Sequence, residues 1–146
     1  MTDLLYKQIE NIIDKEAPLI SNLANVASLL FKMENLNWAG FYLANEDVLY
    51  LGPFQGDPAC IFIKKGKGVC GTSFLKKESI IVDDVNCFAG HIACSSLSKS
   101  EIVVPIIKGD KVVAVIDIDS PIYSRFKQSD KVFLENVASL LAKLDW

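Results

Sequence analysis

The chain has 146 residues, of which 51% are hydrophobic, and it carries a formal net charge of -3. This length fits a single domain, residues 1–146, that can bury a core of its own. The lysines are scattered rather than massed on one face, which argues against nucleic acid as a partner. The sequence has no run of the roughly 20 apolar residues that span a bilayer, and it does not begin like a secretion signal. We therefore expect a cytoplasmic protein that does not bind membranes.

The first half of the chain predicts two helices, then three strands and a short third helix. Apolar residues recur at helical spacing from Leu4 to Phe31, and Pro18 divides them into two helices. The period then changes to two, which predicts strands at 37–44, 47–54 and 59–65, with a hairpin turn between the first two. A short helix that begins with glycines follows at 66–79.

The remainder predicts three more strands and a closing helix. Residues 80–85 read as a strand, 86–99 as a polar loop, and 101–107 and 111–120 as two strands joined by a short hairpin connection. The last helix starts near Ser129, the expected N-cap. Since hairpins join most strands, we expect an α+β fold: an antiparallel six-stranded sheet with helices on one face and a loop-covered ligand pocket on the other.

Three acidic residues point to a cluster on that second face. Asp117 and Asp119 are two apart on a predicted strand, so their side chains share a face, and Glu101 opens the neighbouring strand. If the cluster is enclosed, repulsion and desolvation would raise at least one carboxyl pKa, leaving an acid that can donate a proton near neutral pH. The alternative is that these acids end their strands at a solvated edge.

The cysteines allow several readings. In a reducing compartment structural disulfides are not expected, and Cys60, Cys70 and Cys94 stand in glycine-rich or polar surroundings that suit reactive thiols. Cys60 and Cys70 could equally be buried as small apolar residues. A zinc site made of Cys60, Cys70, His91 and Cys94 would lack the paired C-x-x-C spacing of known zinc sites, so we expect no metal and no cofactor. Cys87 has no distinguishing context.

Two aromatic residues complete the candidates. Trp38 and Tyr42 lie four apart on the first predicted strand and therefore on one face. They could wall an apolar subsite or pack beneath a helix, and the residues alone favour the core.

Four stretches together resemble one family, the free methionine-(R)-sulfoxide reductases, which are stand-alone GAF domains. They are "NWAGFYL", "LGPFQGDPACIFIKKGKGVCGTSF", "VDDVNCFAGHIACSSLSKSEIVVPI" and "VIDIDSPIYSRF", and they run from Asn37 to Phe126. The three cysteine motifs "PAC", "GKGVCG" and "GHIAC" are more specific than any feature of the GAF fold itself. Cys87 is additional to this three-cysteine pattern.

The resemblance implies a homodimeric enzyme that reduces free methionine-(R)-sulfoxide and is recycled by a thioredoxin-type reductant. It implies that Cys94 is the catalytic cysteine, that Cys60 is the principal resolving thiol with Cys70 as a further redox-active one, and that Glu101 with Asp119 protonates the sulfoxide oxygen. It also implies that Trp38, Tyr42, Asp83 and Asp117 bind the substrate, which overturns the core reading of the two aromatics. The alternative function is a non-catalytic GAF module that senses redox state or a small molecule.

Overall fold

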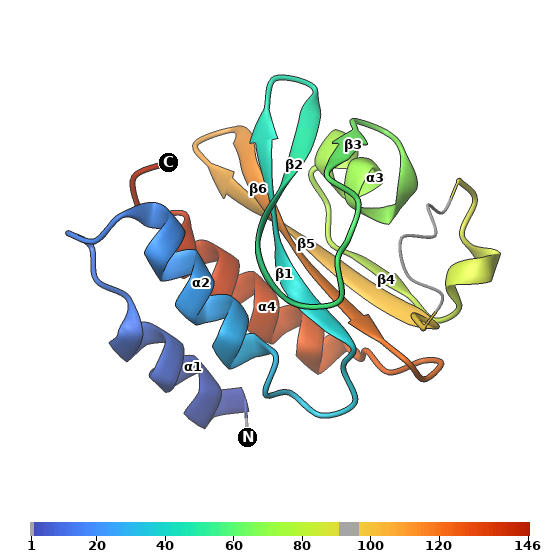
Figure 1. The fold of residues 1–146 in the computed structure, drawn as a ribbon, viewed down its shortest axis with the longest axis horizontal. Coiled ribbons are helices and arrows are strands. Elements are labelled where there is room, and N and C mark those ends of the chain that lie inside the picture. The colour runs from blue at the N-terminus through green and yellow to red at the C-terminus, as the bar shows by residue number, and fades with distance from the viewer. Residues whose placement is uncertain (1, 91–96) are drawn as a thin grey trace.

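Six strands form one antiparallel sheet in a computed structural model that describes residues 2–90 and 97–146 (Figure 1). The strand order is β3-β2-β1-β6-β5-β4, so the two long strands β1 and β6 are central. The strands are β1 (Trp38–Asn45), β2 (Val48–Gly56), β3 (Phe62–Lys64), β4 (Ile80–Val82), β5 (Ser100–Lys108) and β6 (Lys111–Ser120).

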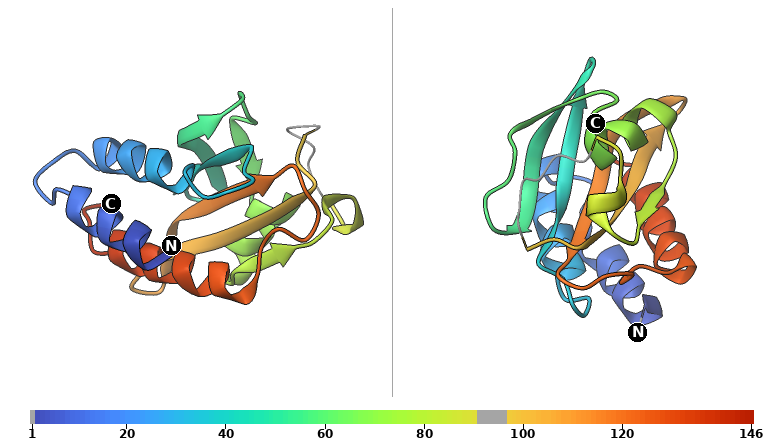
Figure 2. Two further views of the ribbon diagram at one scale, coloured as in Figure 1. Left: turned by 90° about the horizontal axis from the view of Figure 1, so that it is seen from below. Right: turned by 90° about the vertical axis from the view of Figure 1, so that its right-hand side faces the viewer.

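Three helices cover one face of this sheet and a fourth lies on the other. The helices are α1 (Thr2–Ile12), α2 (Leu19–Leu30), α3 (Gly68–Lys76) and α4 (Gln128–Leu141). Alternate residues of the central strands, such as Phe41 and Ile116, share a buried core with α1, α2 and α4, and Figure 2 shows α4 running along that side of the sheet. The residues between them face α3, where Tyr42 and Val115 pack with Phe74 in a second core. The predicted α+β architecture is confirmed.

Several boundaries differ from the sequence-based prediction. The strand expected at 59–65 is limited to Phe62–Lys64. The strand expected at 80–85 ends at Val82, and a 3-10 helix, η1 (Val85–Cys87), follows it. Asp84 caps that helix, because its carboxylate accepts a hydrogen bond from the Asn86 N–H at 3.0 Å.

The closing helix begins earlier than expected. Its N-cap is Lys127, not Ser129, and the carboxylate of Asp130 accepts a hydrogen bond from the Lys127 N–H at 2.8 Å. Asp130 is held by an ion pair with Arg125 at 3.2 Å. A carboxylate in the first turn satisfies an unbonded N–H and complements the helix dipole, so this end is determined by Asp130 rather than by a serine hydroxyl.

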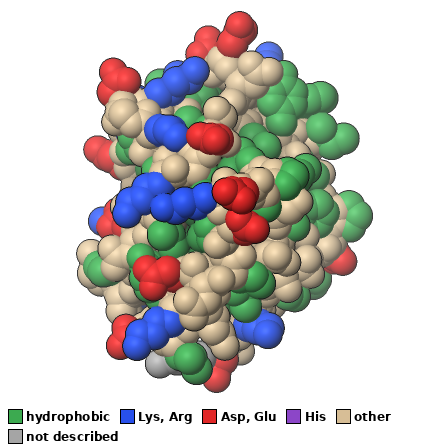
Figure 3. Space-filling model, turned by 90° about the vertical axis from the view of Figure 1, so that its left-hand side faces the viewer, with side chains coloured by type: hydrophobic (Ala, Val, Ile, Leu, Met, Phe, Trp, Pro, Cys, Tyr) green, Lys and Arg blue, Asp and Glu red, His purple; other side chains and the backbone are tan. Residues whose placement is uncertain are grey.

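The surface beside α1 and α2 carries both charged and apolar groups (Figure 3). Acidic and basic side chains are interspersed there, and hydrophobic side chains gather along one side of the view. Between Ala17 and Phe31 the chain has no charged residue, and Ile20 on α2 is 64% exposed. Within residues 2–90 and 97–146, no helix is long and apolar enough to cross a bilayer.

Candidate active site

A cavity of about 50 Å³ lies between the sheet and the first turn of α3. Because a single water needs only about 10–15 Å³ of such space, there is room beside the lining groups for part of a ligand. The side chains that matter for the chemistry come from β1, α3, β5 and β6. They are Trp38, Tyr42, Cys70, Glu101, Asp117 and Asp119.

Strand register builds the acidic side of the cavity. Asp119 of β6 pairs with Glu101 of β5 on one side and with Trp38 of β1 on the other. Asp117, two residues earlier, points to the same face and lies opposite Gly40. Glu101 and Asp117 are only 7% and 6% exposed. The predicted acidic cluster is therefore confirmed, and the solvated-edge alternative is wrong.

Two aromatic side chains line the cavity and form hydrogen bonds with the connection between β2 and β3. The indole N–H of Trp38 donates to the carbonyl oxygen of Asp57 at 3.0 Å, and the Tyr42 hydroxyl donates to that of Cys60 at 2.9 Å. The two rings stack at 5.9 Å between centroids. Both belong to the core on the α3 side and both line the cavity. The core reading and the pocket-wall reading therefore both describe these residues, because the wall is the edge of that core.

Enclosure changes the acidity of the cluster. Burial raises the pKa of Glu101 well above its ordinary value, and the carboxylates of Asp117 and Asp119 raise it further. Burial also raises the pKa of Asp119, followed by the charge of Asp117, while a hydrogen bond with Glu101 acts in the opposite direction. The Glu101–Asp119 pair therefore retains a proton at pH values where isolated carboxyls have lost theirs.

This raised pKa predicts a pH-dependent effect of Glu101→Gln on stability. Between the ordinary carboxyl pKa and the raised one, the folded protein holds a proton that the unfolded chain has released, so wild-type stability falls as pH rises. Glutamine does not titrate, so the variant does not lose stability through position 101 as pH rises. We therefore expect the free energy of unfolding of the variant, relative to that of wild type, to increase as pH rises through this window, by about 1.4 kcal/mol for each unit by which the pKa is raised.

Urea unfolding at a series of pH values, under reducing conditions, measures this difference. Glu10→Gln, an exposed change on α1, serves as the control and should follow the wild-type curve. Parallel curves for wild type and Glu101→Gln would contradict the raised pKa.

The described cysteines differ in burial and in bonding. Cys60 is half-buried in the connection between β2 and β3 and is disulfide-bonded. Cys70 is a buried free thiol on α3, and Cys87 is an exposed free thiol whose Sγ lies 3.6 Å from Asp84 Oδ2. Cys94, the predicted nucleophile, and His91 lie outside the described residues.

Asp83 does not join the cavity. It is exposed and follows the last residue of β4, whereas Val82 is the residue that pairs with Glu101. Because successive side chains of a strand point to opposite faces, the residue after Val82 is directed away from the acidic face. The structure thus brings together all the described substrate-site candidates except Asp83.

Sequence reasoning missed two polar residues that line the cavity. Lys67 stands at the N-cap of α3, and Ser98 precedes β5. The glycines around Lys67 in "GKGVCG" mark a tight entry into a helix, a signal that would have placed Lys67 beside Cys70. Ser98 accepts a hydrogen bond from the Asn37 side chain at 3.1 Å, a contact between residues far apart in sequence.

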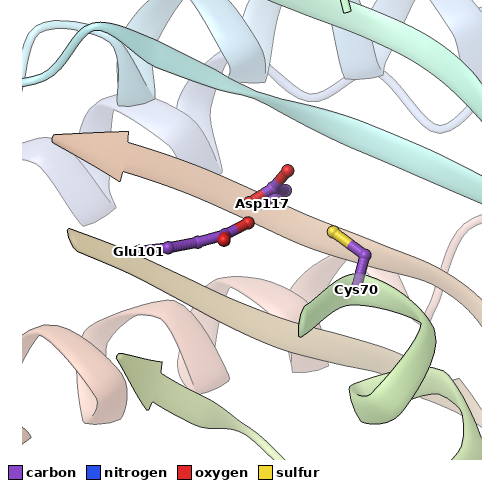
Figure 4. Close-up of side chains that lie close together, drawn as sticks. All are labelled: Cys70, Glu101 and Asp117. Atoms are coloured by element: carbon purple, nitrogen blue, oxygen red, sulfur yellow. The ribbon is translucent and has the colours of Figure 1, made fainter. Parts of the chain in front are cut away.

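One set of groups in the described part of the chain has the donor types of a metal site. Cys70, Glu101 and Asp117 each place a ligand atom within 4.8 Å of the others, and their side chains point toward one another (Figure 4). This set differs from the cysteine and histidine set considered above for zinc, and its two carboxyls are the groups that would handle a substrate proton and charge.

The class of protein is defined by comparison with known families. A family model of the GAF domain matches residues 18–144. Free methionine-R-sulfoxide reductase of Saccharomyces cerevisiae is 48% identical over 143 residues, which cover 92% of this chain and 79% of the yeast protein. The enzyme of the same name from Escherichia coli is 42% identical over 130 residues, covering 88% of this chain and 79% of its own length.

Solved structures agree with these relatives. The X-ray structure of free methionine-R-sulfoxide reductase from Neisseria meningitidis in complex with its substrate superimposes with a TM-score of 0.94 at 40% identity. The match covers 97% of this chain and 86% of that one. The chain therefore belongs to the GAF domain family and, within it, to the free methionine-R-sulfoxide reductases, which are oxidoreductases.

Proposed function

We propose that this protein reduces free L-methionine-(R)-sulfoxide to methionine. The observation that carries the proposal is the Glu101–Asp117–Asp119 cluster, with Glu101 and Asp117 buried, beside the Trp38 and Tyr42 wall, in a chain that belongs to this reductase family. A chromatographic assay that separates the sulfur epimers of free methionine sulfoxide tests it, because only the R epimer should be consumed.

The chemical step needs a nucleophile and an acid. The Cys94 thiolate attacks the sulfoxide sulfur while the Glu101–Asp119 pair delivers its proton to the sulfoxide oxygen. A bond forms between the Cys94 sulfur and the substrate sulfur as the sulfur–oxygen bond breaks and the oxygen, which has taken up two protons, leaves as water. A water molecule then attacks the Cys94 sulfur, the sulfur–sulfur bond breaks, methionine leaves and a proton is released, so Cys94 is left as a sulfenic acid, oxidised by two electrons as the substrate is reduced by two. An acid with a raised pKa suits this role, since it holds its proton to a higher pH than an ordinary carboxyl does.

Recognition of a free amino acid follows from the charges in the cavity. Asp117 accepts the α-ammonium group, and the ring faces of Trp38 and Tyr42 contact the methylene chain and the sulfur-bound methyl group. Within a peptide that nitrogen is a neutral amide, which would leave the buried carboxylate without its countercharge. Asp83, being exposed, would contribute at most to the charge near the opening.

The Cys94 sulfenic acid must then be reduced back to a thiol before the next turnover. The Cys60 thiol condenses with the sulfenic acid, which releases water and leaves a disulfide. A thioredoxin-type dithiol then reduces that disulfide by exchange. Cys60 suits this task because it is half-buried in a connection and disulfide-bonded in this structure. This chemistry places the protein in a reducing compartment such as the cytoplasm.

A homodimer belongs to the same proposal. The uncharged length of α2 with exposed Ile20 is a surface of the kind that subunit interfaces bury. The alternative function, a GAF module that senses redox state without turnover, would bind or oxidise but would produce no methionine.

A further inference from the structure

The thiol of Cys70 faces the acidic cluster from the opposite side of the cavity. It projects from the first turn of α3 toward β5 and β6, and Figure 4 shows its sulfur directed at the Asp117 and Glu101 carboxyls. The side chain is only 4% exposed, and ligand atoms of all three residues lie within 4.8 Å of one another. Its neighbours are therefore carboxyls rather than solvent.

The backbone around Cys70 has little freedom to carry this thiol elsewhere. A Cβ on Gly71 would lie 2.4 Å from the carbonyl oxygen of Lys64, so the helix packs there backbone against backbone. The Gly66 N–H donates to the Gly71 carbonyl at 2.8 Å, and the Gly71 N–H donates to that of Lys67 at 2.9 Å. The start of α3 therefore holds Cys70 in place beside the acidic cluster.

The charges that face Cys70 disfavour its thiolate. Burial raises the pKa of the thiol well above its ordinary value, and Asp117, Glu101 and Asp119 raise it further, helped by a side-chain hydrogen bond with Asp117. From β1 the group on this side is Tyr42, whose pKa burial also raises. Lys67 is the cation that lines the cavity from the start of α3. Since the thiolate is the reactive form in sulfur exchange, these surroundings suit a hydrogen-bond donor better than a nucleophile.

We infer that Cys70 is a positioning residue whose thiol stays protonated and donates a hydrogen bond to Asp117, holding that carboxylate in place, and that Cys70 does not resolve the sulfenic acid. The inference rests on the proposed function, in which Asp117 receives the substrate ammonium. Cys60 alone then acts as the resolving thiol. Under this inference Cys70 does not have the redox role that the family resemblance implied.

Serine and alanine at position 70 separate the two roles. Cys70→Ser keeps a small donor and should retain both KM and recycling within about threefold of wild type. Cys70→Ala removes the donor next to a charged acceptor, and we expect KM for the sulfoxide to rise about tenfold or more while thioredoxin-driven cycling remains intact. Cys60→Ser provides the contrast: it should give one equivalent of methionine in a single turnover and then cycle slowly. Cys87→Ser, an exposed thiol, is the matched control.

Three outcomes would overturn the inference. Equal behaviour of the serine and alanine variants, with normal single turnover but lost recycling, would make Cys70 a redox thiol. An unchanged KM in Cys70→Ala would remove the positioning role, and a serine variant as impaired as the alanine one would show that the effect on KM does not come from a donated hydrogen bond.

A titration that needs no turnover tests the protonation state separately. In a variant that retains Cys70 as its sole cysteine, the ultraviolet absorbance of the thiolate should stay absent up to pH 9, the ordinary thiol value. A thiolate that forms at or below that pH would contradict the inference whether or not the protein reduces methionine sulfoxide. Failure of wild-type protein to consume any sulfoxide, with the titration as expected, would instead count against the proposed function.

Discussion

Cys94→Ser should abolish formation of methionine from its sulfoxide. A serine hydroxyl is a far weaker nucleophile than a thiolate and has no sulfur that can be oxidised to a sulfenic acid, so no partial reaction is left to the variant. The measurement is methionine formed per enzyme in a single turnover without added reductant, where wild type should yield one equivalent. We expect Cys94→Ser to yield none.

Cys87→Ser is the control for this variant, because Cys87 is an exposed free thiol outside the cavity. It should match wild type in both the yield and the rate of the single turnover. One equivalent of methionine from Cys94→Ser would remove Cys94 from the mechanism and direct attention to the remaining thiols.

Glu101→Gln should lower kcat/KM by about 10²–10⁴-fold, the usual contribution of a general acid. Glutamine keeps the shape of the side chain but has no proton of suitable acidity for the sulfoxide oxygen. Because the pKa of Glu101 is raised, wild-type activity should fall as pH rises through that raised value, and the variant should lack this alkaline decline. The pH profile thus distinguishes loss of an acid from a general disturbance of the cavity.

Glu16→Gln, an exposed acid outside the cavity, is the matched control and should leave the profile unchanged. If Glu101→Gln kept the alkaline decline of wild type, the proton would come from another group, and the Glu101–Asp119 pair would be left with a binding role only.

Alternation along the strands made much of the site predictable. A period of two placed Asp117 with Asp119 and Trp38 with Tyr42 on shared faces, and hairpin connections brought β5 beside β6, so Glu101 met Asp119. These are local rules, and they hold because the strands are long and regular. The pocket on the side opposite α1, α2 and α4 followed from the same pattern.

Features that depend on strand ends or on long-range packing were not predictable. Asp83 falls outside the cavity because Val82, not Asp83, pairs with Glu101, and this register between β4 and β5 is not marked in the local sequence. The different settings of Cys60 and Cys70 depend on how α3 docks on the sheet, which no local pattern encodes. The same is true of Ser98, whose partner Asn37 lies 61 residues away.

The most direct test of the proposed reaction is a chiral chromatographic assay of free L-methionine sulfoxide, with both sulfur epimers present and dithiothreitol as reductant. N-acetylmethionine sulfoxide, which lacks the ammonium group that Asp117 would bind, is run in parallel. We expect the R epimer of the free amino acid to disappear with equimolar formation of methionine, while its S epimer and the acetylated compound remain. If folded, reduced protein consumed neither epimer of the free amino acid, the catalytic account would be contradicted and a sensing GAF module would take its place.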